Sequence, residues 1–316
     1  MNYRSISDMA NLIRNNLALI SDDIDLVVGV PRSGLLAAGI IALHKNLNVV
    51  GLNSFLSNDV VSTGHTRKAS HPTLACSHDA KHVLLVDDSS ATGKSMQAAL
   101  ASVYNSGYKG RITTCAVYLA PDSPKIDVYF ELLPPMRVFE WNMMHREFLS
   151  ECCVDFDGVL CVDPTDEQND GGEKYLKFLD SATPLLIPIY PIGRIVTSRL
   201  EKYRAQTEEW LQKHKVNYQK LDMLDLPDEH TRRKLRIHAK FKSVIYAKDL
   251  EMRLFIESNR EQSVEIAHRS GKPALCVSTQ ELFVPGITVP YAIQASRRWK
   301  RKGITFLKKV IRKNEV

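Results

Sequence analysis

The stretch from Val83 to Ser95, VLLVDDSSATGKS, constrains the fold more than any other part of the sequence. Its four consecutive apolar residues, Val83 to Val86, predict a strand buried on both faces, as in a parallel sheet. Two carboxylates and a turn of small residues follow, and a helix is predicted over Met96–Asn105. The start of such a helix offers unpaired main-chain N–H groups and the positive end of its dipole to an anion. The stretch therefore predicts an α/β fold with an anion-binding turn.

The two carboxylates and the turn together indicate which kind of molecule carries the bound anion. Asp87 and Asp88 can accept hydrogen bonds from a pair of vicinal hydroxyls. A diol and a phosphate bound side by side suggest a ribose 5-phosphate. The phosphate would be held by the backbone of the turn, Ala91, Thr92, Gly93, Lys94 and Ser95.

The end of this turn also looks like part of a P-loop. A P-loop requires a glycine five residues before its second glycine, and that position is Asp88. An ATPase is therefore disfavoured. Position by position, the stretch resembles the 5-phosphoribosyl-1-pyrophosphate (PRPP) binding motif of type I phosphoribosyltransferases. The resemblance implies a parallel sheet flanked by helices and a transfer of phosphoribosyl from PRPP.

An earlier strand and helix fit the same resemblance. Leu26–Val30 is predicted as a buried strand, and it runs through PRSG into a helix over Leu35–Leu43. In the resembled family the corresponding loop holds the pyrophosphate, which implies roles for Arg32 and Ser33. Strands predicted over Asn48–Leu52 and Ile112–Leu119 continue the alternation of strand and helix.

A long polar segment, Ser57 to Ala75, separates two of these strands and exceeds an ordinary connection. In the family a loop at this place closes over the substrate, which implies Arg67 and Lys68 as pyrophosphate ligands and His65 as a proton acceptor. The alternative is a solvated loop without a role. Purine-salvage relatives carry a base-reading aspartate at the position of Ala91, so a purine acceptor is disfavoured.

A second motif begins at Glu151, where the apolar run CCV leads into DFDGVL. Two carboxylates two residues apart, followed by a glycine that permits a sharp turn, resemble motif I of haloacid dehalogenase (HAD) phosphatases. The resemblance implies that Asp155 attacks phosphorus and that Asp157 serves as general acid and base.

Three further pieces follow in the order of that family. Thr197, after the predicted strand RIV, would hold a phosphoryl oxygen. Lys242 would neutralise the phosphate, with Lys240 as its rival. Glu257, at the end of LFIE, would hold Mg²⁺ beside Asp155 and the Asp157 carbonyl. This fourth motif departs from the commoner paired aspartates, so Asn259 and Glu261 are further candidate helpers.

The interval from Asp157 to Thr197 is too short for a large cap domain. This predicts an open site, which suits a phosphate group attached to a large molecule. The HAD resemblance thus implies a second parallel sheet with little or no cap. Predicted domains are residues 1–148, 149–288 and a tail, 289–316.

Composition places the positive charge of the chain in the tail. The 316 residues carry a net charge of +6, yet nine Lys or Arg stand against one Glu over residues 297–316. On a helix, Trp299 and Phe306 lie opposite these charges, which suits either a peripheral membrane contact or packing on the second domain or a partner. Nucleic-acid binding is disfavoured, since no groove-reading element accompanies the charges.

Neither a leader nor an apolar stretch of about 18 residues is evident, which predicts a cytoplasmic protein, peripheral at the inner face of the cytoplasmic membrane if the tail binds there. The six cysteines form no C-x-x-C pair and are predicted to be reduced and mostly buried.

Together the motifs predict a bifunctional enzyme. The first domain would transfer 5-phosphoribosyl from PRPP to an acceptor with Mg²⁺, and the second would hydrolyse the 5-phosphate to leave a ribose. Such pairs resemble proteins that add ribofuranose to bacterial surface polysaccharides, which implies a lipid-linked glycan acceptor. The alternatives are a nucleobase phosphoribosyltransferase joined to a 5′-nucleotidase, and a regulator that senses PRPP or a nucleotide without turnover.

Overall fold

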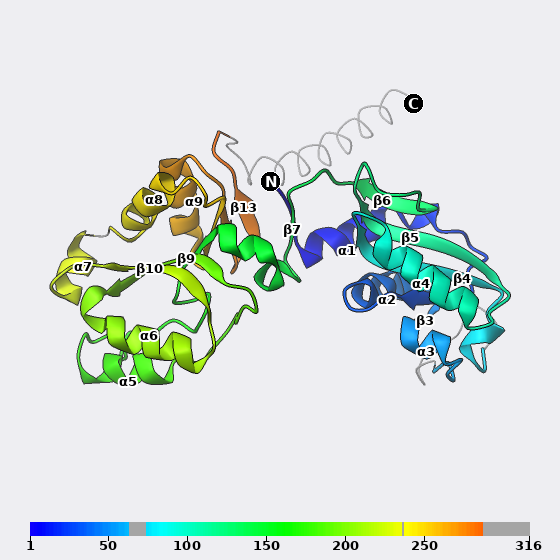
Figure 1. The fold of residues 1–316 in the computed structure, drawn as a ribbon, viewed down its shortest axis with the longest axis horizontal. Coiled ribbons are helices and arrows are strands. Elements are labelled where there is room, and N and C mark those ends of the chain that lie inside the picture. Colours follow the sequence, from blue (N-terminus) through cyan, green and yellow to red (C-terminus); the bar gives the residue numbers. More distant parts are fainter. Residues whose placement is uncertain (63–73, 236, 287–316) are drawn as a thin grey trace, which may run out of the picture. The chain divides into compact units, whose positions relative to one another are not determined.

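The computed structural model describes residues 1–62, 74–235 and 237–286. They fall into two compact units, Met1–Trp141 and Asn142–Val316, which are described separately below (Figure 1). The predicted functional boundaries at residues 148 and 288 stay predictions. The candidate ligands His65, Arg67 and Lys68 and the tail 289–316 lie outside the described residues.

The first unit is built on a parallel sheet with the strand order β3-β2-β4-β5-β6. A separate parallel pair joins β1 to β7. The elements are β1 (Asn2–Arg4), α1 (Ile6–Asn15), β2 (Leu26–Gly29), α2 (Gly34–Lys45), β3 (Asn48–Gly51), α3 (Leu52–Leu56), β4 (His82–Ser90), α4 (Lys94–Asn105), β5 (Arg111–Leu119), β6 (Val128–Leu132) and β7 (Arg137–Phe139).

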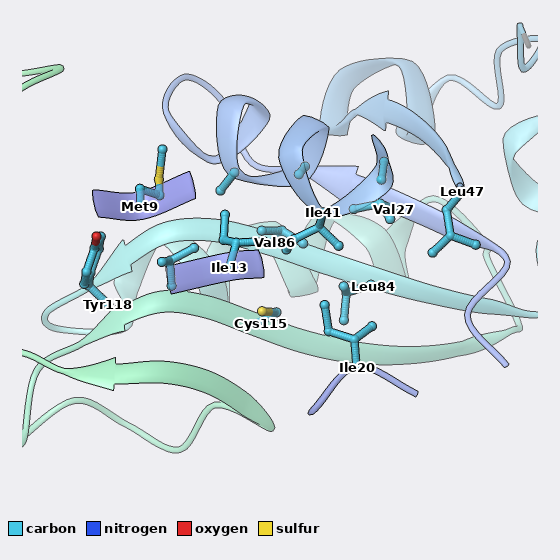
Figure 2. Packing of buried hydrophobic residues seen from close by; sticks show 14 of the residues in the cluster. Met9, Ile13, Ile20, Val27, Ile41, Leu47, Leu84, Val86, Cys115 and Tyr118 are labelled. Carbon is cyan, nitrogen blue, oxygen red and sulfur yellow. The ribbon is translucent and has the colours of Figure 1, made fainter. Parts of the chain in front are cut away.

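Alternate residues of the central strand β4 pack on opposite faces of this sheet. Leu84 and Val86 join α1 and α2 in one core, in which Figure 2 labels Met9, Ile13 and Ile41 together with the two strand residues. Val83 and Leu85 join α3 and α4 in the other core. A strand covered on both faces needs the unbroken apolar run that β4 has, because successive side chains point to opposite faces.

The carboxyl ends of three strands in the first unit differ from the predicted ones. β4 continues through both aspartates to Ser90, and Asp87 pairs with Ala116 of β5. The sheet can extend this far because β5 is equally long. β2 ends at Gly29 and β3 ends at Gly51. Leu52, predicted at the end of a strand, instead begins α3.

The second unit holds a sheet with the order β10-β9-β8-β11-β12-β13, parallel except for the last pair. The predicted α/β class with parallel sheets is therefore confirmed for both units. The elements are β8 (Cys152–Val154), α5 (Glu173–Ser181), β9 (Ile192–Leu200), α6 (Arg204–Lys213), β10 (Tyr218–Leu224), α7 (Glu229–Leu235), α8 (His238–Lys248), β11 (Leu254–Glu257), α9 (Arg260–Ser270), β12 (Ala274–Cys276) and β13 (Glu281–Phe283).

Helices cover both faces of the second sheet. α8 and α9 pack on one face around Tyr246 and Phe255. α5 and α6 lie on the other side (Figure 1), where Trp210 is 1% exposed and meets Phe156 edge-on at 5.0 Å. Phe156 lies between the two carboxylates of the DFD motif, so this contact fixes the segment that carries them.

Each sheet reverses its winding next to one central strand. In the first unit β2 leads outward to β3, and β4 returns on its other side. In the second unit β8 leads to β9 and β10, and β11 returns beside β8. Loops diverge at such a point and leave a crevice at the carboxyl ends of the strands, where open α/β sheets bind ligands.

All six cysteines are free, and five of them are buried, as predicted. Within the described ranges, no helix has the length and hydrophobicity to cross a bilayer.

Candidate functional site

The pairing of β2 with β4 brings the two predicted binding loops together. The loop after β2 carries Arg32 and Ser33, and β4 carries Asp87 and Asp88 next to it. Gly34 makes this possible, since a Cβ there would lie 2.7 Å from the Val86 carbonyl oxygen and 3.0 Å from the Asp87 Cα. The α2 backbone therefore reaches β4 only because residue 34 has no side chain.

Both oxygens of the Asp88 carboxylate are hydrogen-bonded. Oδ1 accepts from Ser33 Oγ at 2.6 Å, and Oδ2 accepts from Trp141 Nε1 at 2.8 Å. The Trp141 ring stacks on Phe139 at 4.8 Å. The donors orient a carboxylate that is only 4% exposed, and an ionised carboxylate still has lone pairs for a ligand hydroxyl.

Asp87 is also buried, and its Oδ1 accepts the main-chain N–H of Asp88 at 2.9 Å. Burial first, and then the neighbouring Asp88 carboxylate, raise the pKa of Asp87 to about 7. The two neighbouring carboxylates thus repel each other, and a ligand that donates hydrogen bonds or carries a cation would relieve this repulsion.

The turn after β4 is arranged as an anion site would require. Gly93 has φ of +73° and caps α4 without a side-chain hydrogen bond, so the first amides of the helix stay available to a ligand. A Cβ on Gly93 would come within 2.8 Å of Pro124. The other residues of the turn are exposed, namely Ala91, Thr92, Lys94 and Ser95.

A cavity of about 610 Å³ opens at the winding reversal of the second unit. It collects the predicted residues from four separate segments, because Asp155 follows β8, Thr197 lies in β9, Lys242 in α8, and Glu257 ends β11. The volume is within the range of ~300–1,000 Å³ typical of small-molecule sites.

Lys242 links two carboxylates that line this cavity. Its Nζ donates to Asp155 Oδ2 and to Glu257 Oε2, both at 2.7 Å, and to Gln262 Oε1 at 3.1 Å. The rival Lys240 is exposed. Burial, and then Glu257, raise the pKa of Asp155, while Lys242 opposes the rise. Burial alone lowers the pKa of Lys242, but its two carboxylate partners raise it overall, so this lysine stays charged.

Asp157 has a partner that the motifs do not include. Arg199 Nη2 donates to Asp157 Oδ1 at 2.6 Å, and Nε contacts both oxygens at 3.1 and 3.2 Å. The guanidinium lies 3.8 Å from the centre of the Phe156 ring, and its side chain is 0% exposed. Arg199 therefore fixes the rotamer of Asp157 through charge-assisted hydrogen bonds.

The predicted metal site is tested by the charges around Lys242. In the described part of the chain, no group of three or more His, Cys, Asp or Glu side chains is arranged to hold a metal ion. Two buried carboxylates nevertheless share one ammonium, and Ser258, next to Glu257, places its Oγ 3.4 Å from the Asp157 carbonyl oxygen. The Mg²⁺ site at Asp155, Glu257 and the Asp157 carbonyl therefore stays a prediction.

The two further candidates near Glu257 differ in position. Asn259 lines the cavity, but its Oδ1 caps α9 by accepting the main-chain N–H of Gln262 at 3.0 Å. Glu261 is exposed and does not line the cavity. The segment between Asp157 and Thr197 also lines the cavity, through Tyr175 of α5 and Leu185 among others.

Trp141 and Arg199 are among the residues that sequence reasoning missed. Trp141 lies 53 residues from Asp88, and Arg199 lies 42 residues from Asp157. Neither residue is part of a recognisable sequence motif with its partner. The only signal for Arg199 is a charged residue inside an apolar strand, which must find a partner if it is buried.

Known proteins resemble the first unit. Residues 2–153 match the family model of the phosphoribosyl transferase domain. Similar solved structures include a purine phosphoribosyltransferase from Pyrococcus horikoshii Ot3 (21% identity, TM-score 0.32) and the Helicobacter pylori xanthine-guanine-hypoxanthine phosphoribosyltransferase (16%, 0.34), each aligned over 44% of this chain and 92% of its own. A protein designated TT1426 from Thermus thermophilus aligns over 44% of this chain and 88% of its own (16%, 0.31).

Among curated proteins, none matches the sequence. The domain match spans β1 to β8 and so contains the β2 and β4 loops described above. Residues 2–153 are therefore a phosphoribosyl transferase domain of type I, and a second α/β unit follows it in the same chain.

Proposed function

We propose that this chain is a two-step ribosylating enzyme. The first domain transfers 5-phosphoribosyl from PRPP to an acceptor and releases pyrophosphate. The second unit hydrolyses the 5-phosphate and leaves ribofuranose on the acceptor. The observation that supports the second step is the convergence of Asp155, Thr197, Lys242 and Glu257 on one cavity, and these residues occur along the chain in the order of the resembled HAD motifs.

For the transfer, each loop has a proposed task. Asp87 and Asp88 would bind the ribose hydroxyls, and the turn from Ala91 to Ser95 would bind the 5-phosphate. Ser33 orients Asp88, and Arg32 would face the departing pyrophosphate. Arg67 and Lys68 stay candidates for the same task. The bond from the anomeric carbon to pyrophosphate breaks as the bond to the acceptor forms, and the cations stabilise the leaving group.

For the hydrolysis, the Asp155 carboxylate would attack phosphorus and displace the ribose 5-oxygen. Thr197 and Lys242 would hold the phosphoryl oxygens, and bound Mg²⁺ would supply charge neutralisation at the same place. Asp157 would protonate the leaving oxygen and then take a proton from the water that releases phosphate from Asp155. Arg199 would hold the Asp157 carboxyl group in place for both steps.

We further propose a lipid-linked glycan as the acceptor. The purine-reading carboxylate of salvage enzymes is replaced by Ala91, which lies exposed beside the turn. A nucleobase acceptor would yield a nucleotide that the second unit then strips of its phosphate. A pure sensor of PRPP has no need of a nucleophile with its acid.

The test is to incubate the protein with PRPP, Mg²⁺ and a panel of nucleobases and lipid-linked glycans, followed by mass spectrometry. A glycan should gain a pentose, and with Asp155→Asn it should gain a pentose phosphate while pyrophosphate release continues. Loss of both activities in Asp155→Asn would contradict two independent sites. A pentose on nucleobases alone would assign the chain to nucleotide metabolism.

The proposed glycan would be reached at the inner face of the cytoplasmic membrane through the basic tail. This proposal rests on the sequence of residues 297–316, whose nine basic side chains each contribute on the order of 1 kcal/mol near an anionic leaflet. Removing these residues should weaken binding to anionic vesicles and leave hydrolysis of a small phosphate ester unchanged. Equal vesicle binding with and without the tail would refute the membrane contact.

A further inference from the structure

The ammonium group of Lys242 uses all of its hydrogen-bond donors inside the protein. It donates to Asp155 and to Glu257 at 2.7 Å and to Gln262 Oε1 at 3.1 Å, and a lysine ammonium carries three N–H donors. Lys242 can therefore act on a phosphoryl group through its charge, but it can donate a hydrogen bond to one only by giving up a protein partner. A further donor beside Lys242 would hold a phosphoryl oxygen without that loss.

The side-chain amide of Gln262 has only one orientation that satisfies Lys242. An ammonium group donates hydrogen bonds and accepts none, so the amide atom that meets it must be the oxygen, Oε1. The main chain of Gln262 is held as well, because its N–H donates to Asn259 Oδ1 at 3.0 Å at the start of α9. These contacts fix the amide at both ends of the residue, and Nε2, with its two N–H donors, is the end of the amide that does not meet Lys242.

Nε2 of Gln262 is open to a ligand. Gln262 is half-buried and lines the same cavity as Asp155 and Lys242. Nε2 has no hydrogen-bond partner among the described residues, yet it is not one of the side-chain atoms there that are both unpaired and buried. It therefore keeps accessible surface, and its two donors are available at the cavity where its amide oxygen is anchored.

The position of this amide indicates which ligand atom it meets. Lys242 Nζ lies 2.7 Å from Asp155 Oδ2, and Nε2 belongs to the amide group that contacts the same Nζ. A phosphoryl group attacked by Asp155 would thus bring its oxygens close to Nε2. An N–H donor binds an acceptor such as a phosphoryl oxygen and does not bind a metal cation. Because the amide is neutral, it adds no third negative charge to those of Asp155 and Glu257, as a carboxylate at position 262 would.

We propose that Gln262 binds the phosphoryl group of a phosphate monoester in the second unit, by donating a hydrogen bond from Nε2 to a phosphoryl oxygen. This inference rests on the proposed function and deepens it, because it adds a substrate-binding residue that none of the four motifs contains. Lys242 orients the amide and supplies the positive charge, and Gln262 makes the direct hydrogen bond. A donor already held in place loses little freedom when the ligand binds.

Beryllofluoride, BeF₃⁻, tests this hydrogen bond without any turnover. It bonds to a carboxylate oxygen as a phosphoryl group does, and its fluorines take the places of the phosphoryl oxygens. Fluorine NMR of the full chain with Mg²⁺ should show bound signals, and their loss in Asp155→Asn would assign them to the second unit. Gln262→Met should shift one bound signal and weaken binding about tenfold, as expected for one lost hydrogen bond to a charged group. Unchanged signals and affinity would overturn the proposal.

Two further variants separate direct binding from an effect through Lys242. Gln262→Glu keeps an acceptor for Lys242 but has no N–H donor and adds a negative charge, so it should bind beryllofluoride more weakly than Gln262→Met. If Gln262 only positioned Lys242, Gln262→Glu would bind like the unmutated chain, and that result would overturn the proposal. His268→Met is the control on the same helix, since His268 is exposed and does not line the cavity, and it should leave the signals and the affinity unchanged.

The same spectra distinguish failure of this inference from failure of the proposed function. Bound signals that Asp155→Asn removes and Gln262→Met leaves unchanged would keep the proposed phosphatase and reject the role of Gln262. Bound signals that persist in Asp155→Asn, or their absence from the unmutated chain, would reject Asp155 as the nucleophile and with it the inference that rests on it.

Discussion

Replacing Lys242 by methionine should strongly destabilise the second unit. Nζ of Lys242 lies 2.7 Å from an oxygen of Asp155 and 2.7 Å from an oxygen of Glu257, and the three side chains are 3%, 8% and 1% exposed. Methionine keeps most of the length of lysine but removes the ammonium that lies between these carboxylates. Two buried negative charges would then face each other without this countercharge.

The size of the effect follows from this geometry. The two oxygens are at most twice 2.7 Å, or about 5.4 Å, apart. Unit charges at this distance repel by ~3 kcal/mol at an effective dielectric constant of ~20. This agrees with the ~3–5 kcal/mol lost when one partner of a buried ion pair is removed. We therefore expect the free energy of unfolding of the second unit to fall by about 3 kcal/mol.

Urea unfolding with a metal chelator present measures this change. Trp210 reports on the second unit, because it is buried and its Nε1 donates to the Ala182 carbonyl at 2.8 Å. Trp141 and Trp299 are replaced by phenylalanine in all variants. Lys240→Met is the matched control on the same helix, and as an exposed residue it should change stability by less than about 0.5 kcal/mol.

A second substitution checks the electrostatic reasoning. Adding Glu257→Gln to Lys242→Met removes one of the two charges, so it should restore a large part of the lost stability. If Lys242→Met is as stable as Lys240→Met, or if Glu257→Gln lowers stability further, the charge argument is wrong.

Three other predictions concern the first unit. Gly34→Ala should lower the free energy of unfolding by ~1–3 kcal/mol and raise the KM for PRPP, because the new Cβ would lie 2.7 Å from the β4 backbone. Gly39→Ala in the same helix is the control and should be neutral or stabilising, since no atom lies within 4 Å of its Cβ. Equal effects of the two substitutions would refute the close-approach argument. Asp87 has a pKa of about 7 in the folded state and 3.8 in the unfolded state, so the folded state binds more protons between these pH values, and the free energy of unfolding should fall by up to ~4 kcal/mol as the pH rises from 4 to 7. Asp87→Asn should make the free energy of unfolding, measured by urea titration, depend less on pH. An unchanged pH dependence would contradict the assignment. Trp141→Phe keeps an aromatic ring but removes the hydrogen-bond donor to Asp88, so the free energy of unfolding should fall by ~1–2 kcal/mol and the affinity for PRPP should change. Unchanged stability and affinity would show that the contact is unimportant.

Local sequence determined the elements and the chemistry that each of them carries. The apolar run of β4 predicted a strand buried on both faces, and Ser5 and Asp8 form the capping box at the start of α1. The carboxylates Asp87 and Asp155 were found because they directly follow apolar runs. These signals act over a few residues, since they depend on side-chain periodicity and on hydrogen bonds to nearby backbone.

Strand order and the long-range partners were decided only by the tertiary structure. The reversals of winding beside β2 and β8 bring the candidate residues of each unit together, and no local pattern encodes which strand returns next to which. For the same reason the contacts of Trp141 with Asp88 and of Arg199 with Asp157 could not be predicted. Each depends on where two distant segments pack, because burial obliges a polar group to find a partner but does not specify which one.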